Sequence, residues 1–260
     1  MLTFELSQLI SRYLWRWIFG IGVLCLDLLF YLNSQTSAPN SIWEFTFSFL
    51  TSPSQSMLIL PVLFLLITID VIRLDITSNF IQFLTVRATA RTNWFIAKLT
   101  SLFAMSVLYT ILVVNIPLVI GMLGGLDTSY VIGEYSVFFQ TTPLTSLIGT
   151  TLPTFIITFT TLGTMFSILS LYTHHHSVSL VVGTLICLLS YFTYVRYHDI
   201  GIAFKWMLTT HMFLLPKIPT KLFSSNNFSA PSFAWSYGYL LCLYITSVIL
   251  GYMRVRKMNL

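Results

Sequence analysis

Long apolar runs limit what this chain can fold into more than any other feature of its sequence. A helix needs roughly 20 mostly apolar residues to cross the hydrocarbon core of a bilayer, about 30 Å thick, and the 260-residue chain contains six such runs. Charged residues make up only 8% of the chain, whereas soluble domains contain roughly 25%. The sequence therefore predicts an all-α integral membrane protein with a single transmembrane domain over residues 1–260. The six predicted transmembrane helices are Ile18 to Leu32, Met57 to Ile72, Trp94 to Leu123, Leu144 to Leu171, Val178 to Val195 and Phe233 to Met253.

The distribution of Lys and Arg predicts the orientation of these helices, because cytoplasmic loops of membrane proteins carry an excess of both residues. With the N-terminus inside, nine of the 13 basic residues fall in cytoplasmic segments, so both termini are expected in the cytoplasm. These nine are Arg12, Arg16, Arg73, Arg87, Arg91, Lys98, Arg254, Arg256 and Lys257. The net charge of +5 follows from this bias. It does not indicate nucleic-acid binding, because the basic residues are spread along one membrane face.

Two further segments are apolar without being full spans. Between Met1 and Trp17, apolar residues recur at helical spacing while Arg12 and Arg16 lie on another face. This pattern predicts an N-terminal amphipathic helix at the membrane interface, and a simple extension of the first span is the alternative. The segment Ile200 to Pro216 is too short for a full span. We expect it to re-enter the membrane before the sixth helix or to lie flat on the outer face.

Motifs for catalysis and metal binding are missing from the sequence. It contains no G-x-x-x-x-G-K-[ST] motif, so the chain is not expected to bind a nucleotide through a P-loop of its own, and neither H-E-x-x-H nor G-x-S-x-G occurs. His174, His175 and His176 are adjacent, and consecutive helical residues point about 100° apart, so they converge poorly on one ion. We interpret them as a polar turn, and we expect neither a metal site nor a bound cofactor.

Two acidic residues fall inside predicted spans, where ionisable side chains are functional candidates. Asp27 lies in the middle of the first span. Asp70 lies near the cytoplasmic end of the second, three residues before Arg73, which also allows a local ion pair at the interface. A polar contact with a neighbouring helix would explain Asp27 equally well.

The stretch FLTVRATARTNWFIAK, from Phe83 to Lys98, is unusually basic for this chain. If it is helical, Arg87, Arg91, Trp94 and Lys98 lie on one face and form a basic stripe that leads into the third span. An anchor to anionic lipid headgroups is the simpler interpretation of such a stripe.

Taken in order, these features resemble the ABC-2 type permeases, the membrane subunits of bacterial ABC exporters. The resemblance covers the amphipathic N-terminal segment, the six spans, the partly apolar outer loop and the basic tail GYMRVRKMNL. Its most specific part is the pair Arg87 and Arg91 followed by Lys98, which looks like the cytoplasmic loop ahead of the third helix in that family.

The resemblance implies a dimer of permease subunits in a bacterial cell membrane, driven by separate ABC ATPase subunits that bind ATP and Mg. It implies coupling to the ATPase through a loop that contains Asn79, Phe80, Phe83, Arg87 and Arg91. It also implies a substrate path lined by the first, second and fifth spans, for which Asp27 and Asp70 are candidates. The aromatic content of 16% suits a hydrophobic or amphipathic substrate such as an antimicrobial peptide. A secondary transporter and a membrane-embedded hydrolase are the alternatives.

Overall fold

The computed structural model describes residues 17–18, 20–29, 41–69, 71–72, 88–127, 144–173, 175–196, 205–212 and 232–257. Within these ranges the chain is almost entirely helical and forms no strand. In order, its helices are a first short helix Gly20–Leu29, α2 Ile42–Thr51, the π-helix η1 Gln55–Ile59, α3 Leu60–Thr68, α6 Ala88–Leu123, α8 Leu144–Thr173, α9 His176–Val195, the 3-10 helix η2 Thr209–Met212 and α11 Phe233–Lys257.

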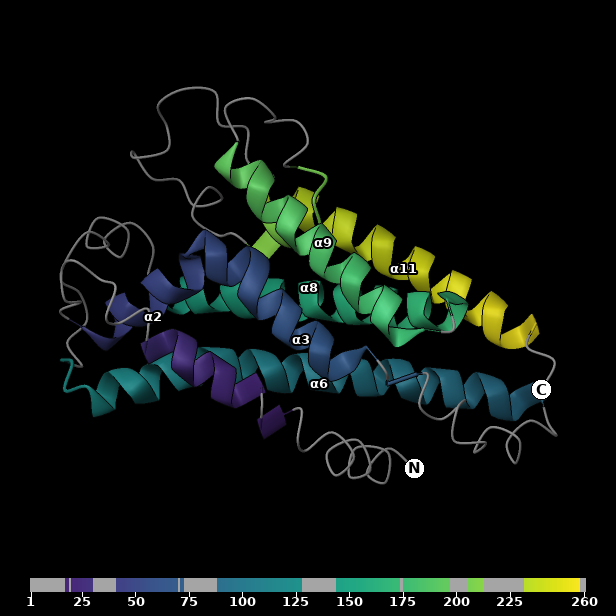
Figure 1. Cartoon of the computed structure of the whole chain (residues 1–260), viewed down its shortest axis with the longest axis horizontal. Coiled ribbons are helices and arrows are strands. Elements are labelled where there is room, and N and C mark those ends of the chain that lie inside the picture. Colours follow the sequence, from purple (N-terminus) through teal and green to yellow (C-terminus); the bar gives the residue numbers. More distant parts are fainter. Residues whose placement is uncertain are drawn as a thin grey trace.

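In the described part of the chain, four helices are long and apolar enough to cross a membrane, and they lie in α6, α8, α9 and α11. Together they form an elongated bundle (Figure 1). The helix pair Ile42–Thr51 and Gln55–Thr68 adds a fifth crossing if the two parts form one span. The predicted all-α architecture with several membrane-spanning helices is therefore confirmed. The count of six stays a prediction, and the amphipathic segment up to Arg16 lies outside the described residues.

The second predicted span, Met57 to Ile72, differs from the structure. Its helix is preceded by α2, which the prediction did not include, and the two parts are bent by 58°. The break occurs because Ser52 precedes Pro53 and adopts an extended backbone with ψ of 128°, as residues before proline do. The start of α2 is held at its N-cap, where the Glu44 backbone N–H donates to the Ser41 hydroxyl at 3.1 Å.

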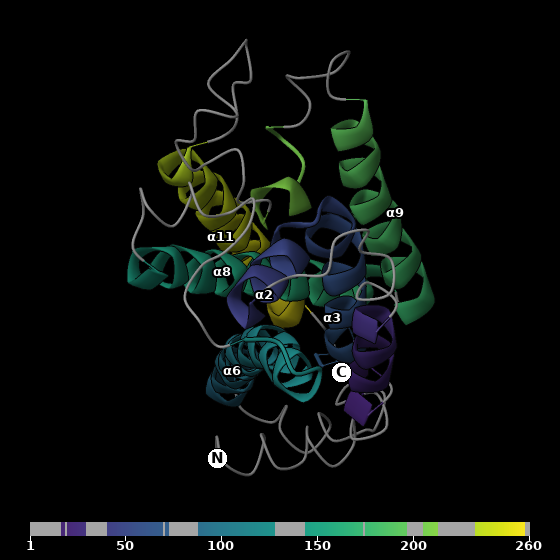
Figure 2. The ribbon, with the colours of Figure 1, turned by 90° about the vertical axis from the view of Figure 1, so that its left-hand side faces the viewer.

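Helix α8 occupies the centre of the bundle, where it contacts α3, α6, α9 and α11 (Figure 2). It is rich in threonine and serine, and many of these hydroxyls donate to backbone carbonyls. The Thr158 hydroxyl donates to Thr154 at 2.7 Å, and the Ser167 hydroxyl donates to Thr68 of α3 at 3.0 Å. Since hydrocarbon offers no hydrogen-bond partner, this pairing lets polar side chains occupy the core of an apolar bundle.

Aromatic rings and glycines set the spacing of the helices. Phe64, Tyr109 and Phe159 pack where α3, α6 and α8 meet, with ring centroids 4.9 to 5.2 Å apart. The Tyr109 hydroxyl donates to the Leu60 carbonyl at 2.9 Å. On α11, a Cβ atom added to Gly251 would lie 2.8 Å from the Phe95 ring. Only a small residue allows this close approach, as in many membrane helix interfaces.

Candidate functional site

The predicted basic stripe enters the bundle along α6. Arg91 is half-buried, while Trp94 and Lys98 are only 3% and 2% exposed. Residues at positions i, i+3 and i+7 share one face of a helix, so this face of α6 points toward the interior. A charge at such depth has to be compensated by neighbouring groups. Lys98 is therefore part of the packed bundle and not an anchor to lipid headgroups.

A polar pair connects the first helix to the broken span. The Gln55 side chain lies beside the Asp27 carboxylate; Gln55 is only 4% exposed and Asp27 is half-buried. One carboxylate oxygen, Asp27 Oδ2, and the amide oxygen, Gln55 Oε1, are both buried without a hydrogen-bond partner in the described part of the chain. An unpaired buried acceptor is costly, typically by about 1–3 kcal/mol. The two oxygens together suit a group that donates hydrogen bonds, such as a water molecule or an ammonium group.

The position of Gln55 depends on a local change in helix type. The Leu60 backbone N–H donates to the Gln55 carbonyl, five residues earlier, and Pro61 has no N–H with which to continue the pattern. Single π-helical turns are often found at functional sites. The break at Ser52 and this turn together expose a polar segment to the interior of the bundle.

The segment that we expected to re-enter the membrane places a short helix inside the bundle. All four residues of η2, Thr209–Met212, are buried, and this helix packs against η1, α8 and α9. His211 Nδ1 lies 3.0 Å from the Ser236 hydroxyl, which links η2 to the start of α11. The segment is therefore packed into the bundle, and its position relative to the bilayer, re-entrant or flat on the outer face, stays a prediction.

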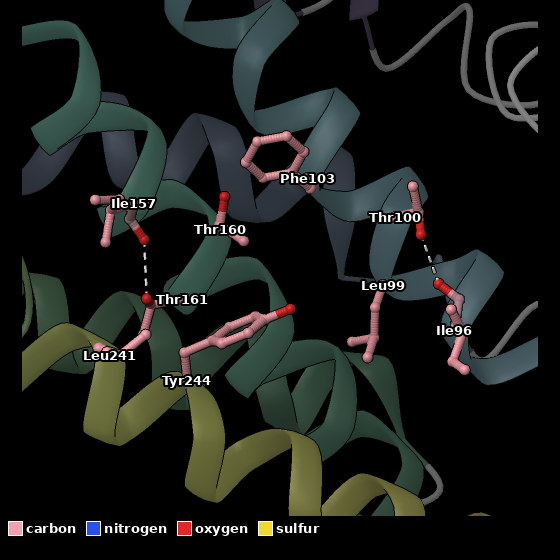
Figure 3. Close-up of a pocket in the computed structure, with 9 residues that line it drawn as sticks. All are labelled: Ile96, Leu99, Thr100, Phe103, Ile157, Thr160, Thr161, Leu241 and Tyr244. Atoms are coloured by element: carbon pink, nitrogen blue, oxygen red, sulfur yellow. Dashed lines mark hydrogen bonds between the residues drawn. The ribbon is translucent and has the colours of Figure 1, made fainter. Parts of the chain in front are cut away.

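A lateral groove of about 450 Å³ opens between α6, α8 and α11 (Figure 3). The Tyr244 ring extends from α11 toward α6 across this space. The hydroxyls of Thr100 and Thr161 donate to the carbonyls of Ile96 and Ile157 at 2.9 and 2.8 Å. Because these hydroxyls bond to backbone carbonyls, the walls are mainly apolar. The lining residues are Ile96, Leu99, Thr100, Phe103, Ile157, Thr160, Thr161, Leu241 and Tyr244.

Comparison with known protein families gives one match that covers nearly the whole chain. The model for a protein of unknown function (DUF2705) matches residues 7–260. The chain belongs to this family. No curated protein matches the sequence. The DUF2705 description names no activity, so the function has to be argued from the residues themselves.

For this DUF2705 protein, the structure describes only two of the predicted site residues. Asp27 lies on the first helix beside Gln55, and Arg91 lies in the first turn of α6. The other predicted site residues, Asn79, Phe80, Phe83, Arg87 and Asp70, lie outside the described residues. Within the described ranges, no three His, Cys, Asp or Glu side chains come together as a metal site would require.

Sequence reasoning missed Gln55 and the groove. Gln55 stands two residues before the predicted second span and between two serines, so it was placed outside the membrane segment. The sequence Ser52-Pro53-Ser54-Gln55 was the available signal, because a proline preceded by an apolar helix indicates a break. The groove had no such signal, since it depends on how three helices diverge.

Proposed function

We propose that this chain is the membrane-spanning permease subunit of an ATP-driven ABC exporter, moving a hydrophobic or amphipathic substrate out of a bacterial cell with separate ATPase subunits. An antimicrobial peptide is one such substrate. Both termini lie in the cytoplasm in this proposal, as the distribution of Lys and Arg favours. A second permease subunit completes the substrate path.

The observation that carries the proposal is the position of α3 between the first helix and α9 (Figure 2). A Cβ atom built on Gly20 would lie 3.4 Å from Ile67, and one on Gly183 would lie 2.6 Å from Leu65. The first, second and fifth predicted spans are thus neighbours. These are the spans that the resemblance to ABC-2 permeases assigns to the path between two protomers.

The outer surfaces of the same helices provide a surface for a second permease subunit. Leu26 and Leu29 of the first helix and Val181, Leu185 and Leu189 of α9 are all more than half exposed. In a dimer, such a surface would pack against its counterpart and enclose Asp27 and Gln55 near the path. Membrane lipids would cover it in a monomer.

Helix α6 supports coupling to an ATPase. It runs without interruption for 36 residues from Ala88, about 54 Å at 1.5 Å per residue. It therefore begins directly after the proposed coupling residues, Asn79 to Arg87, and carries Arg91 in its first turn. Because Trp94 and Lys98 are packed into the bundle, a movement of the coupling segment would be transmitted to the helices around them.

Purification with its partner tests this proposal. Co-expressed with a P-loop ATPase of the ABC type from the same organism, the chain should form a stable complex whose ATPase activity responds to substrate. The purified chain alone should hydrolyse no ATP, since its sequence contains no P-loop. ATP hydrolysis by the isolated chain, or the failure of any such ATPase to bind it, would contradict the permease function.

A secondary transporter is the second candidate, and the broken span favours it. Such transporters place discontinuous helices and an acidic residue near the bilayer midplane, and here Asp27 meets η1 beside the 58° bend. Reconstitution distinguishes the two functions. Substrate transport driven by a proton or sodium gradient, without any ATPase, would favour the secondary transporter, whereas transport that requires ATP and the partner supports the exporter.

A further inference from the structure

The groove between α6, α8 and α11 lies apart from the proposed substrate path, which is formed by the first helix, α3 and α9. Its rim includes Ile96, Phe103 and Leu241, which are 54%, 50% and 56% exposed. These side chains project from helices of membrane-spanning length. The groove therefore opens toward the hydrocarbon of the bilayer.

The groove is small compared with the space that a helix would need. An α-helix with its side chains is about 10–12 Å across, whereas this space of about 450 Å³ is bounded by three helices. The Thr160 hydroxyl donates to the Ile156 carbonyl at 2.7 Å, in the same way as those of Thr100 and Thr161. With its hydroxyls bonded in this way, the groove presents threonine methyl groups and hydrocarbon side chains, which suit contact with an acyl chain.

The C-terminal end of α11, beyond the groove, carries a cluster of positive charge. Arg254, Arg256 and Lys257 lie in its last turn, and both Arg256 and Lys257 are exposed. Arg254 lies over the Tyr172 ring of α8, 5.4 Å from its centroid, and the Tyr172 hydroxyl donates to the Leu250 carbonyl at 3.0 Å. These contacts fix the basic end of α11 against α8.

The distance between the groove and these charges corresponds to one leaflet. Tyr244 and Arg256 are separated by twelve positions, or about 18 Å along a helix. Half of a hydrocarbon core is about 15 Å, so Arg256 lies just outside the hydrocarbon when Tyr244 lies at the midplane. A lipid with its headgroup beside Arg256 and Lys257 can therefore extend one acyl chain along α11 into the groove.

We propose that this groove binds an anionic phospholipid, with one acyl chain between α6, α8 and α11 and the phosphate headgroup at Arg256 and Lys257. Apolar walls select the chain, and the positive end of α11 selects an anionic headgroup over a zwitterionic one. The site needs neither an ATPase nor a transported substrate, so it does not depend on the proposed function.

Native mass spectrometry of the purified full chain, titrated with phosphatidylglycerol or phosphatidylcholine, tests the proposal. We expect one phosphatidylglycerol to be retained preferentially. Replacing Arg256 and Lys257 by Gln should weaken its retention about fivefold for each charge removed, whereas Arg256→Lys should bind like the parent. The matched control is Arg196→Gln with Lys205→Gln, which removes two charges elsewhere and should leave retention unchanged.

A second pair of variants tests the groove itself. Thr160→Phe fills it from α8 and should abolish preferential retention, while Leu185→Phe, on the exposed face of α9, should not. Should Thr160→Phe fail to fold, phosphatidylglycerol carrying a diazirine in its acyl chain gives an independent measurement on the parent protein. It should crosslink to Phe103 and Leu241 more than to Leu185 and Leu189. Equal retention of both lipids, equal losses in the control variants, or equal crosslinking of the two faces would overturn the proposal.

Discussion

The proposed substrate path and the groove differ in how the polar groups beside them are hydrogen-bonded. On the path side, formed by the first helix, the broken span and α9, Asp27 Oδ2 and Gln55 Oε1 have no hydrogen-bond partner in the described part of the chain. On the groove side, formed by α6, α8 and α11, the hydroxyls of Thr100, Thr160 and Thr161 all donate to backbone carbonyls. The path side also contains the 58° bend.

The groove is lined by side chains that suit stable contact with lipid. The path side instead keeps a polar site that lowers the stability of the fold. An unpaired acceptor in an apolar interior is unfavourable, and natural proteins retain such local conflicts chiefly at functional sites. We therefore expect substitutions on the path side to affect transport more than their effect on stability would suggest. Substitutions among the residues that line the groove should change transport little.

The largest effect is expected at Arg87 and Arg91, because in the proposed mechanism α6 transmits movement of the coupling segment to the path side. Replacing Arg87 and Arg91 by Lys keeps the charge but removes the forked hydrogen bonds that a guanidinium can form. Hydrogen bonds to charged groups contribute about 1.5–3 kcal/mol each, so transport and substrate-stimulated ATPase activity should fall more than about tenfold. Basal ATPase activity and membrane insertion should be retained, as measured in proteoliposomes with the partner ATPase.

The matched control lies at the basic end of α11. Arg254→Lys with Arg256→Lys also keeps the charge, and the resemblance gives these residues no part in coupling, so transport should continue. If both double variants transport like the parent, Arg87 and Arg91 are only charge anchors and the proposed coupling role is wrong.

The second largest effect is expected when the pair Asp27 and Gln55 is changed. Gln55→Leu leaves the carboxylate without its polar neighbour and should lower the free energy of unfolding by about 1–3 kcal/mol. Replacing both residues by Leu removes the buried polar groups together, so stability should return to the parent value or exceed it. Transport by the double variant should nevertheless be lost.

Thermal unfolding and transport assays on the parent, the two single Leu variants and the double variant form a double-mutant cycle. A coupling energy near zero would mean that the two side chains do not interact. A double variant that is stable and still transports would show that the pair has no role in the path.

Much of the helical architecture was accessible from the sequence because it follows from length and hydropathy. Helix α9, predicted from Val178 and observed from His176, and α11, predicted and observed from Phe233, needed only an apolar run and its flanking polar residues. The broken span was not predicted correctly, because the apolar composition of α2 and α3 was interrupted by a short polar segment that resembled a loop. The Ser52-Pro53 step was a local signal of a bend, but hydropathy averages over such steps.

The candidate site was less accessible, since its parts come from different elements. Asp27 could be singled out because a carboxylate is rare in a span. Its partner Gln55 could not, because the contact requires the π-helical turn before Pro61 to pack against the first helix. In the same way, the sequence could place Lys98 on one face with Arg91 and Trp94, but only the packing of α6 shows that this face is buried.

The smallest effect is expected on the groove side, at Thr161. Its hydroxyl donates to the Ile157 carbonyl at 2.8 Å and lies 3.4 Å from the Leu240 carbonyl. Each carbonyl oxygen has a second lone pair that can accept a backbone N–H, so Thr161→Val leaves no acceptor stranded and keeps the side-chain shape. The free energy of unfolding should fall by less than about 1 kcal/mol, with transport and lipid retention unchanged. Thermal unfolding of Thr161→Val and Gln55→Leu, measured side by side, provides the comparison. If Thr161→Val lowers the free energy of unfolding more than Gln55→Leu does, the polar groups of the groove side, and not those of the path side, are the costly ones to remove.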